Sequence, residues 1–288
     1  MKPFDYLTPA HVDEAVGLLA DRGDTARVIA GGQSLLLAMK QRDATPRALV
    51  AVGRIPALSG WSAEAAGRLS IGAATSYATL ERAELPGWHA EIAAVAGNLA
   101  DRPVRTMGTI GGALCQADPR FDMPTVAVGV DAELELLSVE GGRRVPAAAF
   151  FDPAGGARCG ATELLTTLSV PGLERFTGAA FQKFRVRTFD AALASVLCAA
   201  RVDEAGRLEE LRVVVGAVAP APLVVEGVAA DLAGAEAASL DTVGAGRAVA
   251  EEAVPLGPSA SDLRRYQREL VAVLARDAIR RATETSRS

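Results

Sequence analysis

The first part of the chain alternates between two hydrophobic patterns. A helical spacing of apolar residues covers residues 12–19, and short apolar runs at 27–30 and 48–52 are typical of buried strands. Between the two runs, residues 34–41 have the pattern of a second helix. These elements predict a small α+β unit over residues 1–56.

A different order of elements follows, and it ends at the turn-forming pair Pro171-Gly172. We expect a strand over 69–73, helices over 77–83 and 89–99, an irregular glycine-rich passage over 105–112, a short helix near 122–124, a hairpin with strands over 132–139 and 144–147, and a last strand within 163–170. The pattern predicts a second unit over residues 57–174.

The third unit, residues 175–288, begins with an alternating segment over 180–187, which is typical of a half-exposed strand. Residues 191–200 fit a strand or a helix, and 208–218 fit a strand. The remainder is mostly helical. In the last helix the following apolar residues share one face: Leu263, Tyr266, Leu270, Val273 and Leu274.

Composition excludes several classes of function. Half of the 288 residues are hydrophobic, which excludes a disordered chain, and a net charge of −5 with 5% aromatic residues argues against nucleic-acid binding. Three widely spaced cysteines and two histidines are too few for an iron–sulfur cluster or a typical zinc site, so no metal site is expected. No apolar run is long enough to span a membrane, and we expect a cytoplasmic protein.

Two twin-glycine segments are the candidates for chemistry. They are Ala30-Gly31-Gly32-Gln33-Ser34 and Thr109-Ile110-Gly111-Gly112. Glycine pairs let backbone N–H groups converge on an anion, so two such loops are able to hold a pyrophosphate. The ordinary role of a Gly-Gly pair is a turn, and neither segment is a dinucleotide fingerprint or a P-loop, so spacing alone leaves both interpretations open.

These two segments, together with Ala117-Asp118-Pro119 and Asp122-Met123-Pro124, give the chain a resemblance to a known family. The sequence resembles the FAD-binding medium subunits of the molybdenum hydroxylases, which include those of carbon monoxide dehydrogenase and xanthine dehydrogenase. The opening Phe4-Asp5-Tyr6 and the late Leu263-Arg264-Arg265 also fit, so the resemblance covers nearly the whole chain.

The resemblance implies a fold and a cofactor. The fold is α+β: a two-subdomain FAD-binding fold of the PCMH type, like that of vanillyl-alcohol oxidase, followed by a C-terminal α+β domain with a small antiparallel sheet. The residues that would hold FAD are Ala30, Gly31, Gly32, Gln33, Ser34, Leu35, Thr109, Ile110, Gly111, Gly112, Ala113, Asp122, Leu165 and Lys183. Both glycine loops would give backbone donors to the pyrophosphate, and Asp122 would bind near the ribityl chain.

Lys183 is one of only three lysines and stands in the middle of the alternating segment. In the family this position lies at the polar edge of the flavin ring, where a cation would favour the reduced flavin. The alternative is an ordinary solvated lysine on a strand.

The resemblance also implies partners and a role. FAD on this chain would take electrons from two [2Fe-2S] clusters on a small subunit, which receives them from a molybdopterin centre on a large subunit, and pass them to an external acceptor. The complex would be a dimer of heterotrimers without nucleic acid or membrane insertion. Such an oxidoreductase subunit needs no catalytic acid, base or nucleophile, and none is assigned here.

Some positions depart from the family. Ala113 stands where asparagine is usual, Ala51 where aspartate is usual, and Ala191 where an aromatic residue is expected beside the flavin. Two alternatives remain: a structural homologue that has lost FAD, which these changes support, and a stand-alone flavin oxidoreductase of the same fold, which would need acid–base residues that the third unit does not show. Among other candidates, Cys115 is either a small packing residue or a redox thiol, and His11 and His89 are expected at the surface or its boundary.

Overall fold

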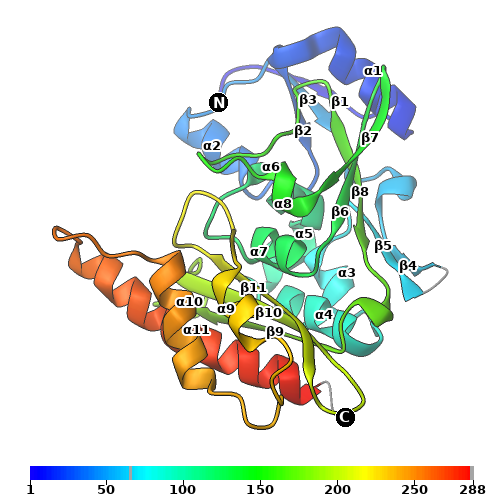
Figure 1. Cartoon of the computed structure of the whole chain (residues 1–288). Helices are drawn as coiled ribbons and strands as arrows, with labels where there is room; N and C mark the ends of the chain where they lie inside the picture. The colour runs from blue at the N-terminus through cyan, green and yellow to red at the C-terminus, as the bar shows by residue number, and fades with distance from the viewer. Residues whose placement is uncertain (65–66, 286–288) are drawn as a thin grey trace.

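The protein contains three sheets, and each belongs to a different stretch of the chain (Figure 1). The computed structural model describes residues 1–64 and 67–285. No helix in these ranges is long and apolar enough to cross a membrane, and no group of three or more potential metal ligands occurs in them.

The N-terminal sheet is parallel, with the strand order β1-β3-β2. Its elements are β1 (Asp5–Leu7), α1 (Val12–Arg22), β2 (Ala26–Ile29), α2 (Leu35–Gln41) and β3 (Ala48–Ala51). Apolar side chains of α1 and β3 form the local core. The first glycine segment leaves the end of β2, so the sheet fixes its position.

The middle sheet is antiparallel and has the order β4-β5-β8-β6-β7. Its strands are β4 (Trp61–Ala63), β5 (Leu69–Gly72), β6 (Glu133–Ser138), β7 (Gly141–Pro146) and β8 (Leu164–Val170). The helices of this part are α3 (Tyr77–Glu81), α4 (Ala90–Gly97), α5 (Arg102–Met107), α6 (Ile110–Gln116), α7 (Asp122–Gly129) and α8 (Ala147–Phe150).

The expectation that residues 105–112 are irregular is wrong, because this passage lies largely within α5 and α6. Side chains cap both helices: Asp101 accepts a hydrogen bond from the N–H of Val104, and Thr109 accepts one from the N–H of Gly112. Such caps satisfy donors that a helix start otherwise leaves free. The second glycine pair is therefore the first turn of a helix.

The C-terminal sheet is antiparallel, with the order β12-β11-β10-β9. Its elements are β9 (Gly178–Phe184), β10 (Ala194–Val202), β11 (Leu208–Gly216), β12 (Leu223–Val225), α9 (Gly227–Leu232), α10 (Thr242–Ala253) and α11 (Asp262–Thr285). The ambiguous segment 191–200 is thus mostly β10, one of the two inner strands. All its side chains from Ala194 to Ala200 are buried, which explains why no alternation marks it.

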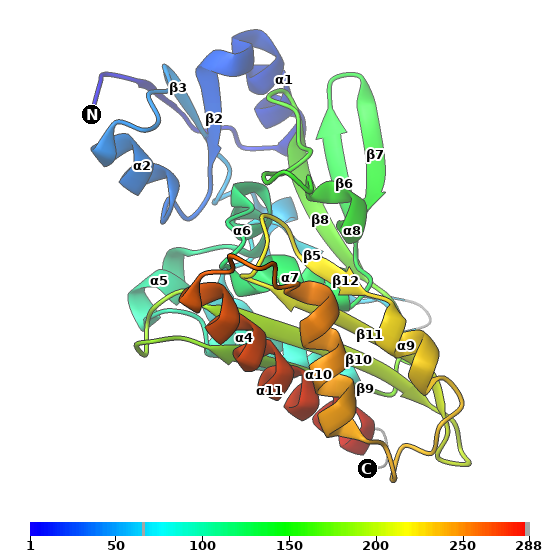
Figure 2. The ribbon, with the colours of Figure 1, turned by 60° about the vertical axis from the view of Figure 1, so that its left-hand side comes forward.

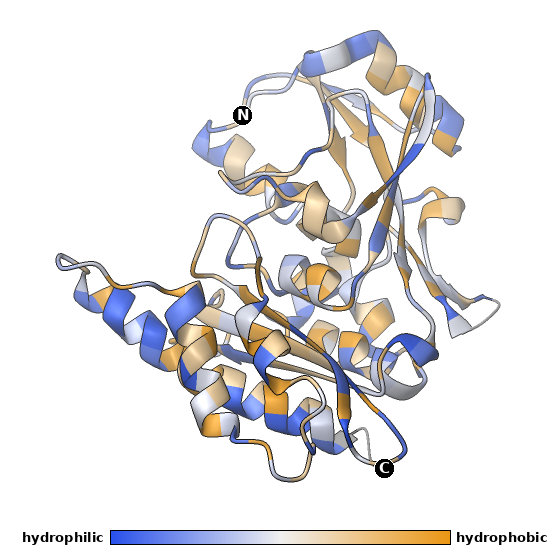
Figure 3. Ribbon diagram, in the orientation of Figure 1, coloured by the Kyte–Doolittle hydropathy of each residue, from blue (hydrophilic) through white to orange (hydrophobic). Residues whose placement is uncertain are grey.

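Helices cover both faces of this sheet (Figure 2). On one face α7 packs against it within the core of the middle unit, and on the other face α10 and α11 pack. The predicted apolar face of α11 is wrong in part, because Leu263, Tyr266 and Val273 are exposed. Other apolar residues, three of them alanines, make the buried face of this helix instead: Val271, Ala275, Ala278, Ile279 and Ala282. Figure 3 shows the hydrophilic residues that remain on its outer side.

Candidate functional site

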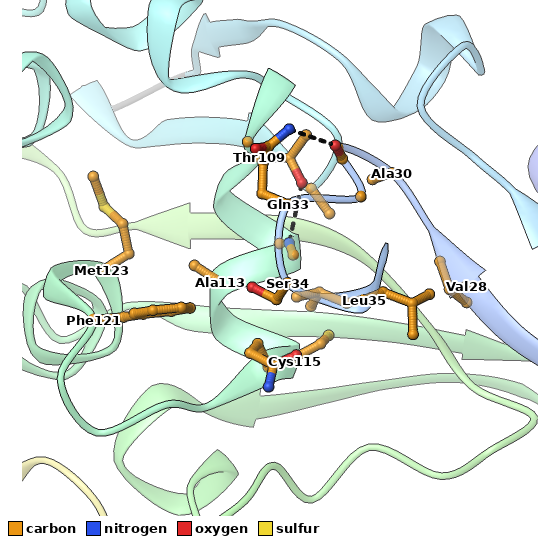
Figure 4. A pocket seen from close by; sticks show the side chains of 18 of the residues that line it. Val28, Ala30, Gln33, Ser34, Leu35, Thr109, Ala113, Cys115, Phe121 and Met123 are labelled. Carbon is orange, nitrogen blue, oxygen red and sulfur yellow. Dashed lines mark hydrogen bonds between the residues drawn. The ribbon is translucent and has the colours of Figure 1, made fainter. Parts of the chain in front are cut away.

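One cavity of about 770 Å³ lies where the three parts of the chain meet. Its walls come from the loop between β2 and α2, from α6 and the start of α7, and from β9. Figure 4 shows Ser34, Leu35, Thr109, Ala113 and Cys115 around this space. The volume is in the range of pockets for large organic ligands.

The loop between β2 and α2 presents a row of unused backbone donors. Among the described residues, none accepts a hydrogen bond from the backbone N–H groups of Gly31 to Leu35. The loop lines the cavity along this whole length, and Gln33 turns its amide back to the carbonyl of Gly31 at 3.2 Å. Neighbouring N–H groups with no internal partner form a ready cradle for an anion.

The second glycine segment differs, because its donors are already bonded. The N–H of Ile110 donates to the carbonyl of Thr75 at 3.0 Å, and that of Gly111 donates to the carbonyl of Ala73 at 2.8 Å. The N–H groups of Gly112 and Ala113 donate to the Thr109 hydroxyl and carbonyl, respectively. The expectation that both loops offer free backbone donors is therefore wrong for residues 110–113.

Close approaches explain why two of the four glycines are glycine, and backbone conformation explains a third. A Cβ on Gly31 would lie 1.9 Å from the carbonyl oxygen of Met107, where the first loop meets α5. A Cβ on Gly111 would lie 2.6 Å from both Ala73 Cβ and its carbonyl oxygen. Gly32 has a φ of +69°, in the left-handed region that favours glycine. The two loops thus pack without side chains at their contacts.

A buried ion pair joins the middle unit to the C-terminal sheet at the cavity wall. The ammonium of Lys183 on β9 contacts the carboxylate of Asp122 at the start of α7, and both side chains are less than 10% exposed. Lys183 also donates to the carbonyl of Asn98 at 3.0 Å. As predicted, Lys183 faces the middle unit, but its charge is neutralised by Asp122.

Burial sets the acid–base behaviour around this pair. Loss of solvation raises the pKa of the Asp122 carboxyl, and the Lys183 ammonium opposes that rise. Burial first, and the negative charge of Asp122 second, also raise the pKa of the Tyr77 phenol, so Tyr77 stays neutral over the physiological range. This part of the cavity wall therefore offers an ion pair and a neutral phenol.

Thirteen of the fourteen predicted site residues line the cavity: Ala30, Gly31, Gly32, Gln33, Ser34, Leu35, Thr109, Gly111, Gly112, Ala113, Asp122, Leu165 and Lys183. Ile110 is the exception, because its side chain is buried in the core of the middle unit. The segment that carries it is in place, but the residue points away from the cavity.

Other residues that were not predicted to hold the cofactor also line the cavity, among them Tyr77, Cys115, Phe121, Cys159 and Phe189. Tyr77 lies at the start of α3, where the sequence shows only a helical pattern. Phe189 is 64% exposed beside the cavity, two residues before Ala191. An aromatic ring is therefore present at this edge, shifted along the chain from its expected place.

His89 is buried, so its expected surface position is wrong, whereas His11 is exposed as predicted. The His89 ring Nε2 lies 2.8 Å from the carbonyl oxygen of Pro171, and Trp88 packs beside the ring. Burial lowers the pKa of His89, while this hydrogen bond and the Glu174 charge partly oppose the change. The ring holds the segment between the middle unit and the C-terminal sheet.

Comparison with known proteins places this site in a family. Residues 2–173 match the FAD binding domain in molybdopterin dehydrogenase, and residues 179–282 match the CO dehydrogenase flavoprotein C-terminal domain. The chain therefore belongs to the FAD-binding medium subunits of the molybdenum hydroxylases, a family of oxidoreductase subunits.

Individual relatives agree over most of the chain. The carbon monoxide dehydrogenase medium chain of Hydrogenophaga pseudoflava is 35% identical over 263 residues, which are 91% of this chain and 89% of that one. The alpha subunit of the 6-hydroxypseudooxynicotine dehydrogenase complex of Paenarthrobacter nicotinovorans is 34% identical over 75% of this chain and 73% of its own length.

Solved structures give the same fold. A chain of the Hydrogenophaga pseudoflava carbon monoxide dehydrogenase superposes with a TM-score of 0.89 at 32% identity, over 99% of this chain and 98% of that one. A chain of quinoline 2-oxidoreductase from Pseudomonas putida 86 gives a TM-score of 0.87 at 27% identity, over the full length of both. The predicted fold class and family are confirmed.

The residues present fit FAD. The row of unused N–H groups from Gly31 to Leu35 suits a pyrophosphate, and the cavity is large enough for the rest of the molecule. A Cβ on Gly31 would collide with the backbone of α5, so glycine at this position lets the loop keep its place beside the cavity.

Proposed function

We propose that this chain carries electrons within a molybdenum hydroxylase, from iron–sulfur clusters on a small partner subunit, through FAD, to an external acceptor. The observation that supports it most directly is the cradle of unpaired N–H groups from Gly31 to Leu35 on a cavity large enough for FAD. When bound, FAD supplies a carrier that accepts two electrons and passes them on.

In this proposal the first glycine loop does most of the binding. The N–H groups of Gly31 to Leu35 would hold the pyrophosphate, with the Ser34 hydroxyl as a further donor. Thr109, Gly112 and Ala113 would form the opposite wall, because all four N–H groups after Thr109 already have partners, either in the segment that follows β5 or in their own helix turn. Leu165 would contribute apolar surface to the ring.

The Asp122–Lys183 pair would orient the remainder of the cofactor rather than provide a free charge. Because the two charges are in contact, the field they create nearby is that of a dipole, which falls off faster than that of a single cation. Lys183 would still present one N–H donor at the ring edge, because Asp122 and the Asn98 carbonyl accept the other two. Lys183 would therefore still favour the reduced flavin, but less strongly than an isolated lysine would.

The division into residues 1–56, 57–174 and 175–288 is part of the proposal. Each range contains one of the three sheets, and the cavity takes lining residues from all three. A large subunit with the molybdenum cofactor and a small subunit with two [2Fe-2S] clusters would complete the complex, as a dimer of heterotrimers.

The proposal is tested on the full chain with and without its partners. We expect the purified chain to take up one FAD, and we expect size-exclusion chromatography with the two partner subunits to give a complex that bleaches the flavin when the substrate is added. Gly32→Ala should reduce FAD uptake, and Gly17→Ala, on the open surface of α1, should not.

Two results would contradict the proposal. A folded chain that takes up no FAD would support the alternative of a structural subunit. A flavin that is reduced by a substrate without any partner would support a stand-alone flavin oxidoreductase.

A further inference from the structure

Two cations meet at the end of α4. The carbonyl oxygen of Asn98, the residue after this helix, accepts hydrogen bonds from the ammonium of Lys183 and from the guanidinium of Arg185, each over 3.0 Å. The side-chain oxygen Oδ1 of Asn98 accepts a second bond from Arg185 at 2.8 Å. Arg185 therefore binds Asn98 with two nitrogens, and its guanidinium lies next to the ammonium of Lys183.

The charges of this cluster do not cancel. Lys183 is paired with the buried carboxylate of Asp122. Among the described residues, no carboxylate forms an ion pair with Arg185, whose guanidinium donates to the two oxygens of Asn98. Burial raises the pKa of the Asp122 carboxyl, and the charges of Lys183 and Arg185 both oppose this rise. Two cations thus share one carboxylate, and one positive charge remains uncompensated.

Arg105 on α5 provides an internal comparison. It binds the same turn, because its Nη1 donates to the carbonyls of Leu99 and Ala100 at 3.0 and 3.2 Å. Its Nε, however, lies 3.1 Å from Oε2 of Glu81, so its charge has a partner. Both arginines help to hold the turn after α4 in place, but of the two it is Arg185 that brings an unpaired charge to it.

This unpaired charge lies behind the cavity wall. Leu99 and Ala100, the two residues that follow Asn98, line the cavity, as does Lys183. Arg185 is two residues after Lys183, which places both side chains on the same face of the extended segment, and it is partly buried. Water and salt screen a partly buried charge less than an exposed one, so its field extends into the cavity.

We propose that Arg185 tunes the flavin: its uncompensated positive charge stabilises reduced FAD in the cavity, and Asn98 positions it for this role. The inference rests on the proposed function, because it concerns the cofactor that this function requires. The reduced flavin ring carries negative charge, so a nearby cation favours it over the neutral oxidised form. Because Lys183 is paired with Asp122, the larger share of this preference belongs to Arg185.

The competing explanation is a purely structural role, in which Arg185 does no more than cap α4. Cations at the C-terminal end of a helix stabilise the helix itself. The two roles need different properties of the side chain, since a cap needs hydrogen-bond donors and the tuning role needs a charge. Lysine keeps the charge without the two-nitrogen contact, and glutamine keeps donors without the charge, so the two substitutions separate the roles.

The test measures the flavin midpoint potential of the full chain loaded with FAD. Arg185→Gln should bind reduced FAD about two- to fivefold less tightly, relative to oxidised FAD, than the wild type does. For a two-electron couple this ratio corresponds to a potential lower by about 10–20 mV. Arg185→Lys should stay close to the wild type, and Asn98→Ala should give a smaller shift in the same direction as Arg185→Gln. Arg187→Gln, which removes an exposed arginine two residues further on, is the matched control and should leave the potential unchanged.

A second readout needs no cofactor. In the FAD-free chain, carbon NMR should show the Asp122 carboxyl titrating at higher pH in Arg185→Gln than in Arg187→Gln, because one of the two cations that oppose its burial is gone. An Arg185→Gln protein that holds FAD at the wild-type potential would overturn this inference and leave the proposed function intact, and so would an Arg185→Lys protein whose potential falls as far as that of Arg185→Gln. A wild-type chain that takes up no FAD would contradict the proposed function and this inference with it.

Discussion

The two sides of the cavity have similar glycine-containing sequences, but they differ in how many backbone N–H groups remain free to bind a ligand. In the first glycine loop the backbone N–H groups of Gly31 to Leu35 are unpaired. In the second glycine segment, those of Ile110 to Ala113 donate hydrogen bonds within the protein. Asp122 and Lys183, which lie on the same side of the cavity as the second glycine segment, likewise neutralise each other in an ion pair. The comparison indicates that the wall with the first glycine loop binds the cofactor, whereas the wall with the second segment and the ion pair stabilises the fold around it.

The largest expected effect is on stability, and it comes from breaking the ion pair in the supporting wall. Lys183→Met leaves the Asp122 carboxylate buried without a partner, which should lower the free energy of unfolding by about 3–5 kcal/mol in urea titrations. The double variant Asp122→Leu/Lys183→Met removes both charges and should recover much of this loss. Lys40→Met, on an exposed lysine, is the matched control and should change little.

If Lys183→Met were as stable as the Lys40→Met control, the pair would not support the wall. An unchanged flavin midpoint potential in a folded Lys183→Met protein would further show that the lysine does not act on the cofactor.

The next effect separates the two glycine pairs by stability. Gly111→Ala puts a Cβ 2.6 Å from the Ala73 carbonyl oxygen, which belongs to the backbone and has little room to move. We expect a loss of about 1–3 kcal/mol in the free energy of unfolding, typical of an overfilled core site. Gly17→Ala meets nothing within 4 Å and should leave stability equal or slightly higher. A Gly111→Ala protein as stable as Gly17→Ala would contradict this account of the second loop.

A smaller change in stability, with a larger change in binding, is expected at the first loop. Gly32→Ala forces a residue with a Cβ to keep a φ of +69°, which costs about 1–2 kcal/mol. Because the strain falls on the cradle itself, FAD affinity should fall more than stability. Fluorescence titration of FAD into Gly32→Ala and Gly111→Ala measures this, with the affinities compared at equal folded fractions. Equal loss of affinity in both variants would remove the distinction between the loops.

The smallest effect lies outside the cavity, at His89. Its pKa is lowered in the folded protein, so the neutral ring is favoured there and unfolding takes up a proton. Stability from this group is complete above the ordinary histidine pKa, about 6.5, and declines as the pH falls below it. His89→Gln should flatten the stability profile between pH 7.5 and 5.5, and exposed His11→Gln should not. An identical profile in both variants would contradict the role given to His89.

Most of the fold could be predicted from the sequence, because the local hydrophobic patterns agreed with a family resemblance that covers nearly the whole chain. The strand before Gly31 and the helix after Ser34 follow from periodicity, and the structure places them where a binding loop is needed. The pattern failed at residues 105–112, where the side-chain caps of Asp101 and Thr109 start two short helices that hydrophobic spacing does not reveal.

The sequence predicted which residues line the site, but not which of their N–H groups and charges remain free to act on a ligand. Thirteen of the fourteen chosen residues line the cavity, but whether the N–H of Gly111 is free depends on Ala73, which is distant in sequence. The same holds for Lys183, whose charge meets Asp122 only through the packing of β9 on α7. Contacts of this range leave no trace in spacing or composition.

The most direct test of the central claim is amide hydrogen exchange of the full chain with and without FAD. The account predicts that, without FAD, the amides of residues 31–35 exchange rapidly and those of 110–113 slowly, and that FAD strongly slows exchange at 31–35 only. Rapid exchange at 110–113 in the free chain, with FAD protecting that segment and leaving 31–35 unchanged, would show that the binding wall and the supporting wall have been assigned the wrong way round.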